Sequence, residues 1–188
     1  DFAESTIFNI AEKKSKGSFQ SLGELINLNI DKLEEQQGKD GGLSGLSTGY
    51  SKLNSITSGL QKSDLIILAA RPSMGKTAFA LTMARNAAIA KKPVAIFSLE
   101  MSAVQLTTRL ISSETEITSN KLKKGDLADH EWEQLNTRVK ALVDAPIFID
   151  DTPALSIFEL RAKCRRLKEQ HKIELIVVDY IQLMRAGD

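Results

Sequence analysis

The amino-acid sequence predicts an α/β fold, a mainly parallel sheet with helices on both faces. Short apolar runs alternate with longer segments of helical periodicity from Ser51 onward. Each run is almost continuously apolar, which is typical of parallel strands that are buried on both faces. The strands are expected at residues 65–69, 94–99, 147–149 and 173–178.

Helices are expected between these strands, and capping residues mark two of their starts. Ser102 and Ser156 each precede a segment of helical periodicity and can accept a hydrogen bond from its first turn. The helix after Ser156 is expected to run to about Gln170. Another helix is expected at residues 76–90, and a further one contains Trp132, Leu135, Val139 and Leu142.

Residues 1–44 differ from the rest of the chain and are interpreted as a linker region. Within residues 20–37, apolar side chains recur at helical spacing and predict an amphipathic helix, with its stripe formed by Leu22, Leu25, Ile26, Asn29 and Leu33. A short helix is marginally stable alone, so it must pack on its own domain or on a neighbouring subunit, and the residues leave both open. The glycine-rich segment 37–45 predicts a flexible hinge, after which the main domain occupies residues 45–188.

Composition limits the classes of function. Lys and Arg number 25 and Asp and Glu 24, so the net charge is +1, and aromatic residues make up only 5% of the chain. A strongly basic nucleic-acid module or an aromatic surface for stacking bases is therefore not expected, although a ring can still concentrate charge locally. The single cysteine and the lack of a membrane-length apolar run fit a cytoplasmic protein. Because the chain opens with Asp1 rather than Met, it is expected to be an internal fragment of a longer protein.

The strongest motif stands between a predicted strand and a predicted helix, and it reads Ala70-Arg71-Pro72-Ser73-Met74-Gly75-Lys76-Thr77. This is the setting of the phosphate-binding loop of P-loop ATPases. Backbone N–H groups of the loop would surround the phosphates of ATP, Lys76 would place its ammonium on the outer phosphates, and Thr77 would place its hydroxyl on Mg²⁺. Ala70 stands where the motif usually has its first glycine, which requires a negative φ or tolerated strain.

Two carboxylates follow apolar runs and are candidate partners of this loop. Glu100 follows the run 94–99, and Asp179 follows the run 173–178. Since the carboxyl ends of parallel strands meet at one edge of a sheet, both acids could reach the crevice that holds Lys76. Asp179 is predicted to help hold the magnesium ion. Glu100 is predicted to be the general base that orients water toward the γ-phosphate. Each acid could instead face solvent or cap a helix.

Two other features are interpreted as structural. Asp150 and Asp151 precede Thr152-Pro153 and are expected to form a turn and a helix entry rather than a paired acid site. Cys164 shares an apolar stripe with its neighbours at helical spacing and is expected to be a core residue.

Three ordered segments, residues 69–77, 97–102 and 176–184, resemble the DnaB-type bacterial replicative DNA helicases. Further similarity lies in residues 105–110 and 148–153, and the resemblance covers nearly all of residues 45–184. It implies a RecA-like P-loop NTPase that is incomplete at its C-terminus, in a family where alanine is normal at the position of Ala70. By matching position, it also implies that Lys76 and Thr77 hold phosphate and magnesium, that Glu100 is the catalytic base, and that Asp179 is the acidic magnesium partner. Gln182 lies in the third segment without an assigned role.

The same resemblance implies partners. The family works as a ring-shaped hexamer on single-stranded DNA, driven by ATP hydrolysis between subunits, and its intact members meet primase and a helicase loader. It favours docking of the helix in residues 20–37 on the adjacent subunit. The family's sensor glutamine, DNA-binding loops and arginine finger lie beyond the position of Asp188, so weak hydrolysis is expected of this chain alone.

The expected function is therefore an ATP-dependent DNA helicase motor of replication, located in the cytoplasm with the nucleoid. The alternative is a RecA-like regulatory or remodelling ATPase that does not move on DNA. A third interpretation is that this chain acts alone only in binding and assembly.

Overall fold

The computed structural model describes residues 21–36 and 43–185, and the chain divides into two compact units, residues 1–42 and 43–188. In the first unit, α2 (Leu22–Gln36) forms the helix expected within residues 20–37. Ser21 and Glu24 cap its start reciprocally, since each backbone N–H donates to the other side chain. The helix exposes the large apolar side chains of Leu22, Leu25, Ile26, Leu28, Ile30 and Leu33. The glycine-rich hinge, residues 37–45, lies mostly outside the described residues.

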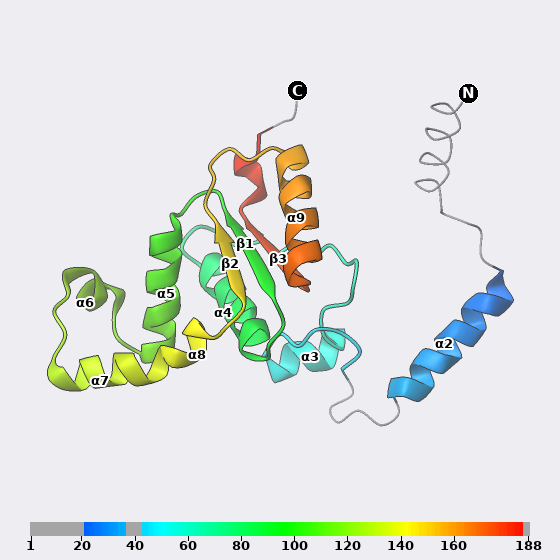
Figure 1. Cartoon of the computed structure of the whole chain (residues 1–188), viewed down its shortest axis with the longest axis horizontal. Coiled ribbons are helices and arrows are strands. Elements are labelled where there is room, and N and C mark those ends of the chain that lie inside the picture. The colour runs from blue at the N-terminus through cyan, green and yellow to red at the C-terminus, as the bar shows by residue number, and fades with distance from the viewer. Residues whose placement is uncertain (1–20, 37–42, 186–188) are drawn as a thin grey trace. The chain divides into compact units, whose positions relative to one another are not determined.

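The second unit contains a three-stranded parallel sheet with the order β2-β1-β3 (Figure 1). Its elements are α3 (Ser51–Thr57), α4 (Lys76–Ile89), β1 (Val94–Ser98), α5 (Ala103–Thr115), α6 (Ser119–Lys124), α7 (Asp129–Arg138), α8 (Lys140–Val143), β2 (Ile147–Asp150), α9 (Ile157–His171), β3 (Leu175–Asp179) and the 3-10 turn η1 (Ile181–Leu183). No helix among the described residues is both long enough and apolar enough to cross a membrane.

The central strand β1 is buried along its whole length, and its side chains alternate between two hydrophobic clusters. Val94 and Ile96 pack with apolar residues of α4 and α5 on one face of the sheet. Ala95 and Phe97 pack with apolar residues of α9 on the other face. The sheet therefore has helices on both faces, as the sequence predicts, and the register pairs Val94 with Ile147 and with Leu175.

Most predicted elements are confirmed within a few residues. The three strands expected at residues 94–99, 147–149 and 173–178 are β1, β2 and β3. The caps are confirmed as well, because Ser102 and Ser156 each form a complete capping box at the start of α5 and α9. The long helix expected around Trp132 is instead two pieces, α7 and α8, which are interrupted at Val139.

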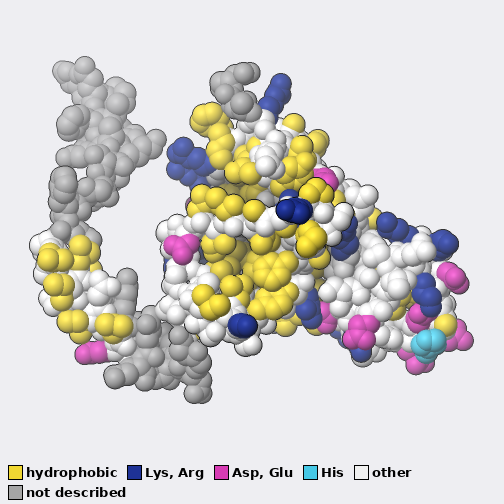
Figure 2. Space-filling model, turned by 180° about the vertical axis from the view of Figure 1, so that it is seen from behind, with side chains coloured by type: hydrophobic (Ala, Val, Ile, Leu, Met, Phe, Trp, Pro, Cys, Tyr) yellow, Lys and Arg dark blue, Asp and Glu magenta, His cyan; other side chains and the backbone are white. Residues whose placement is uncertain are grey.

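The strand expected at residues 65–69 is wrong for this structure. These residues do not form a strand. Their apolar side chains are exposed, Leu65 by 85% and Ile67 by 81%. An apolar sequence becomes a strand only when a neighbouring strand accepts its backbone hydrogen bonds. In the described part of the chain no strand pairs with this run. Figure 2 shows that hydrophobic side chains gather in the middle of one face of this unit.

The structural interpretation of the two neighbouring acids is supported by their contacts. Asp150 accepts hydrogen bonds from the Lys163 ammonium at 2.6 Å and from the Thr152 backbone N–H at 3.0 Å. Asp151 accepts from the first backbone N–H of α5, at Ala103, at 2.8 Å. Both acids thus hold the turn after β2 to neighbouring helices. Cys164 is partly buried against the α9 side of the core, as expected.

Replacing Asp150 tests the ion pair with Lys163. Burial raises the pKa of Asp150, but the hydrogen bonds from Lys163 and Thr152 outweigh it and lower the pKa below its ordinary value of 3.8. The stabilisation is thus fully present above that value and is lost as the pH falls through the lowered pKa. We expect Asp150→Asn to reduce the free energy of unfolding by about 1 kcal/mol at pH 7. The difference from wild type should shrink below about pH 4.

Denaturant unfolding of the 188-residue chain at several pH values measures this difference. Asp126→Asn is the matched control, because Asp126 is exposed and its side chain makes no ion pair or hydrogen bond with the described residues. Two outcomes would contradict a stabilising ion pair between Asp150 and Lys163. One is an equal loss of unfolding free energy in both variants, and the other is a difference between Asp150→Asn and wild type that stays the same at acidic pH.

Candidate nucleotide-binding site

The loop of residues 70–77 leads directly into α4, whose N-cap is Gly75. Gly75 has φ = 87°, a left-handed conformation that favours glycine, and a Cβ added there would meet no atom within 4 Å. The need for glycine is therefore conformational rather than steric. Ala70 is not among the described residues with positive φ, so alanine stands there without that strain.

The central contact of the site joins β3 to the start of α4. Asp179 is the last residue of β3 and is only 7% exposed. One carboxylate oxygen lies 2.9 Å from the Lys76 Nζ, and the other accepts a hydrogen bond from the Thr77 hydroxyl at 2.6 Å. Two residues that are adjacent in the loop thus share one nearly buried carboxylate that follows Thr77 by 102 positions.

Tyr180 adds a second contact to the same lysine. The Lys76 Nζ lies 4.3 Å from the centre of the Tyr180 ring, which is within the range of a cation–π interaction. The ammonium is therefore held between a carboxylate and an aromatic face.

Glu100 stands on a short loop that is fixed on both sides. Before it, the Ser98 hydroxyl donates to the Met101 carbonyl oxygen at 2.7 Å and accepts from the Met101 N–H at 3.2 Å. After it, α5 begins with the Ser102 capping box and with the bond from Ala103 to Asp151. The Leu99 N–H also donates to the Asp179 carbonyl oxygen at 2.8 Å, which ties this loop to the end of β3.

These groups surround a cavity of about 510 Å³, which we call the loop cavity. Its lining includes seven of the eight predicted loop residues together with Glu100 and Gln182. Met74 is the exception, since its side chain is 73% exposed and does not line the cavity. Asp179 lies outside the lining but contacts Lys76 and Thr77. The structure thus brings the predicted acids and loop together at the carboxyl edge of the sheet.

The sequence did not predict four lining residues, Ala78, Met101, Arg109 and Tyr180. Ala78 and Met101 directly follow the predicted residues Thr77 and Glu100. Tyr180 directly follows Asp179, so its position was available from the motif. Arg109 lies midway along α5 and reaches the cavity through the packing of α5 beside α4. No spacing rule for the loop predicts that packing, although Arg109 falls inside one of the segments with family resemblance.

The residues present fit a magnesium ion better than a metal held only by protein. No group of three or more His, Cys, Asp or Glu side chains suited to a metal occurs within residues 21–36 and 43–185. Mg²⁺ commonly takes one or two protein oxygens and completes its shell with water and substrate phosphates. The Thr77 hydroxyl and the Asp179 carboxylate, 2.6 Å apart, offer that limited set of hard oxygen donors.

The sheet order, the loop and the helix at the carboxyl edge define a RecA-like ATPase fold. A solved ATPase domain superposes with a TM-score of 0.83 at 29% identity, over 91% of this chain and 61% of that one. A DnaB-like replicative helicase, whose structure was described with its interactions with primase, superposes with a TM-score of 0.77 at 28% identity, over 98% of this chain and 45% of that one.

The profile of the DnaB-like helicase C-terminal domain matches residues 45–188, and the chain belongs to this family. The replicative DNA helicase DnaB of Geobacillus stearothermophilus is 43% identical over 188 residues, which is 100% of this chain and 41% of that protein. The chain therefore spans about two fifths of the length of such curated relatives. Family membership implies use of a nucleotide. The division into a linker region and an ATPase domain remains a prediction.

Paired glycine substitutions test the role of the loop conformation. Gly75 and Gly125 both have positive φ, and a Cβ added at either would meet nothing within 4 Å. We expect Gly75→Ala and Gly125→Ala each to cost about 1 kcal/mol of stability, because alanine resists that backbone conformation. Only Gly75→Ala should weaken ATP binding, by roughly tenfold, since only Gly75 lines the loop cavity.

Thermal unfolding and equilibrium nucleotide binding of the two variants measure these effects. Similar ATP affinity in both variants would show that the loop conformation at Gly75 does not matter for binding.

Proposed function

We propose that this chain is the nucleotide-binding part of an ATP-dependent DNA helicase motor of replication. The observation that carries the proposal is the shared contact of Asp179 with Lys76 and Thr77, beside a cavity that Glu100 also lines. A phosphate-binding lysine, a hydroxyl, a buried acid and a second acid are among the parts that phosphoryl transfer to water uses. Family membership and the named replicative helicases support the choice of a helicase among such ATPases.

The loop would hold ATP through its backbone N–H groups and through Lys76, which would leave Asp179 to meet the outer phosphates. Bound Mg²⁺, held by Thr77 and Asp179, would supply positive charge to the β- and γ-phosphates. Glu100 would orient a water molecule toward the γ-phosphorus and accept its proton. The new bond joins the water oxygen to that phosphorus, and the bond to the β–γ bridging oxygen breaks, so that ADP and orthophosphate form.

The proposed partners follow from the family. One similar structure was described with its interactions with primase, so primase is proposed as a partner of the intact protein here. Single-stranded DNA, bound mostly by other parts of the intact protein, and a helicase loader are proposed on the family resemblance. The proposed location is the cytoplasm, in association with the nucleoid.

Self-association into a ring, with six subunits expected, is proposed to use α2. This helix exposes a row of large apolar side chains that includes Leu25, Ile26 and Leu33. A short amphipathic helix is stable only when its apolar side is covered. We propose that a second copy of the chain covers it, as the family resemblance favours.

Replacing Glu100 tests the catalytic proposal in the intact protein. Glu100→Gln should leave ATP binding nearly unchanged but reduce turnover by roughly two to four orders of magnitude, because the amide cannot accept the proton from water. Single-stranded DNA should stimulate the wild-type turnover and should not restore the variant. The measurements are nucleotide affinity and steady-state ATP hydrolysis with and without a single strand.

Glu133→Gln is the matched control, since Glu133 is an exposed glutamate of α7 that does not line the loop cavity. Normal turnover by Glu100→Gln would remove Glu100 from the mechanism. Robust hydrolysis that ignores single-stranded DNA would favour the regulatory or remodelling ATPase, and no hydrolysis by the intact wild type would favour a role only in binding and assembly.

A charge on the apolar side of α2 tests the ring proposal. Leu33→Asp should shift the intact protein toward smaller assemblies in light scattering, because a buried carboxylate without a partner is costly at an interface. Asp31→Asn, an exposed change on the same helix, is the control and should leave the assembly unchanged. An unaltered mass for Leu33→Asp would exclude α2 as the docking element.

A further inference from the structure

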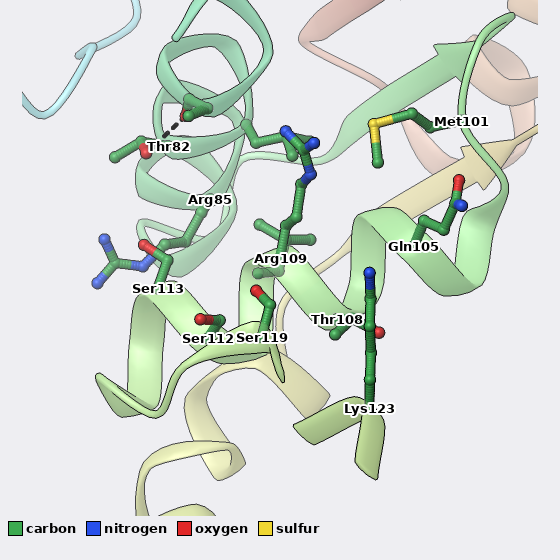
Figure 3. Close-up of a pocket in the computed structure, with 13 residues that line it drawn as sticks. Thr82, Arg85, Met101, Gln105, Thr108, Arg109, Ser112, Ser113, Ser119 and Lys123 are labelled. Carbon is green, nitrogen blue, oxygen red and sulfur yellow. Dashed lines mark hydrogen bonds between the residues drawn. The ribbon is translucent and has the colours of Figure 1, made fainter. Parts of the chain in front are cut away.

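A second cavity of about 510 Å³ lies between α4, α5 and α6 and is not part of the proposed mechanism. Figure 3 shows its lining side chains, with Arg109 extending from α5 and Lys123 from α6. We call it the helical cavity. Among the described residues, its lining contains three cationic side chains, Arg85, Arg109 and Lys123, and no acidic side chain.

The three cations differ in whether a carboxylate compensates their charge. The Arg85 Nε lies 2.6 Å from a carboxylate oxygen of Glu114, and a second nitrogen donates to the Asn86 side chain, so its charge is compensated. Arg109 and Lys123 form no ion pair or hydrogen bond with the other residues that the structure describes. Two positive charges therefore face one cavity whose described lining offers them no compensating carboxylate.

Hydrogen-bond donors accompany these charges. The hydroxyls of Thr82, Thr108 and Ser112 already donate to backbone carbonyl oxygens. The hydroxyls of Ser113 and Ser119 make no hydrogen bond within the described ranges, and both line the cavity. The combination of two such cations and two such hydroxyls suits a small anion with several acceptor oxygens.

The rest of the lining narrows the class of anion. No aromatic side chain of the described chain lines the helical cavity, so a nucleotide base would find no ring to stack on. The apolar part consists of aliphatic and thioether groups, including Leu81, Leu110 and Met101. Free phosphate can accept hydrogen bonds from these cations and hydroxyls, and it carries no base that would need a stacking partner.

The helical cavity adjoins the loop cavity. Ala78, Met101 and Arg109 line both cavities, so the two share a wall. Arg109 is the charged member of that wall and can attract an anion from either side. Orthophosphate formed in the loop cavity would thus meet a cation at the boundary and another, Lys123, beyond it.

We propose that the helical cavity binds orthophosphate on its way out of the loop cavity after ATP is cleaved. The source of the phosphate rests on the proposed function, whereas the binding of phosphate by this cavity does not. No covalent bond forms or breaks in this step, because the anion moves intact between two sets of donors. Lys123 is the residue that belongs to the exit site alone, since it lines only the helical cavity.

Binding is tested with inorganic phosphate and the 188-residue chain carrying Lys76→Ala with Asp179→Asn, which weakens the other phosphate site without leaving the Asp179 charge unpaired. Calorimetric titration should show saturable binding, and adding Lys123→Ala should weaken it about fivefold or more, because one charge-assisted bond is lost. Lys124→Ala is the matched control, since Lys124 is exposed in the same helix and does not line the cavity. Absence of saturable binding, or equal affinity in the Lys123 and Lys124 variants, would overturn the site.

The exit role is tested in the intact protein by timing two events in one turnover. Acid quenching measures ATP cleavage, and a fluorescent phosphate sensor measures release. Lys123→Ala should leave cleavage unchanged and slow release severalfold, whereas Lys124→Ala should change neither.

Unaltered release in Lys123→Ala would overturn the exit role even if the cavity binds phosphate. If the wild type cleaves no ATP, the proposed function fails and the exit role fails with it, while the titration still decides whether the cavity binds phosphate.

Discussion

The site depends on the contacts that the Asp179 carboxylate makes with Lys76 and Thr77. The carboxylate is nearly buried, and a buried charge is tolerated only when it is paired and hydrogen-bonded. Lys76 and Thr77 meet that requirement with one oxygen each, and in doing so they fix the first turn of α4 against the end of β3. The position of the loop relative to the sheet therefore follows from the need to satisfy one acid.

The same contacts bear on how Lys76 and Asp179 would change partners under the proposed function. The Lys76 ammonium is compensated by Asp179 and lies against the Tyr180 ring. Under the proposed function, a triphosphate would offer the same ammonium stronger acceptors, and the carboxylate would then be free to hold a metal ion that arrives with the phosphates.

Much of this fold could be predicted from the sequence, because each predicted element carries its own local signal. The strands β1, β2 and β3 are continuous apolar runs, and the helices α5 and α9 begin at serines with complete capping boxes. The meeting of Glu100 and Asp179 at one sheet edge followed from parallel topology alone. Local chemistry and simple topology were sufficient for these features.

The failures involve features that depend on distant partners. The run at residues 65–69 has the composition of a strand, but a strand needs a neighbour, and none of the described strands pairs with it. Arg109 lines the loop cavity only because α5 packs beside α4, which the loop motif does not encode. Met74 belongs to the motif but points away, since the motif constrains the loop backbone more tightly than each side chain.

The hydrogen bonds on either side of Glu100 bear on which acid could serve at this position. The Ser98 hydroxyl holds the Met101 backbone on one side, and Asp151 holds the start of α5 on the other. A main chain anchored at both ends cannot advance to make up for a shorter acid, so the reach of the carboxylate is set by the number of methylene groups in the side chain. Under the proposed function, aspartate at this position would keep the charge but would end one methylene group short of the place from which Glu100 would orient water.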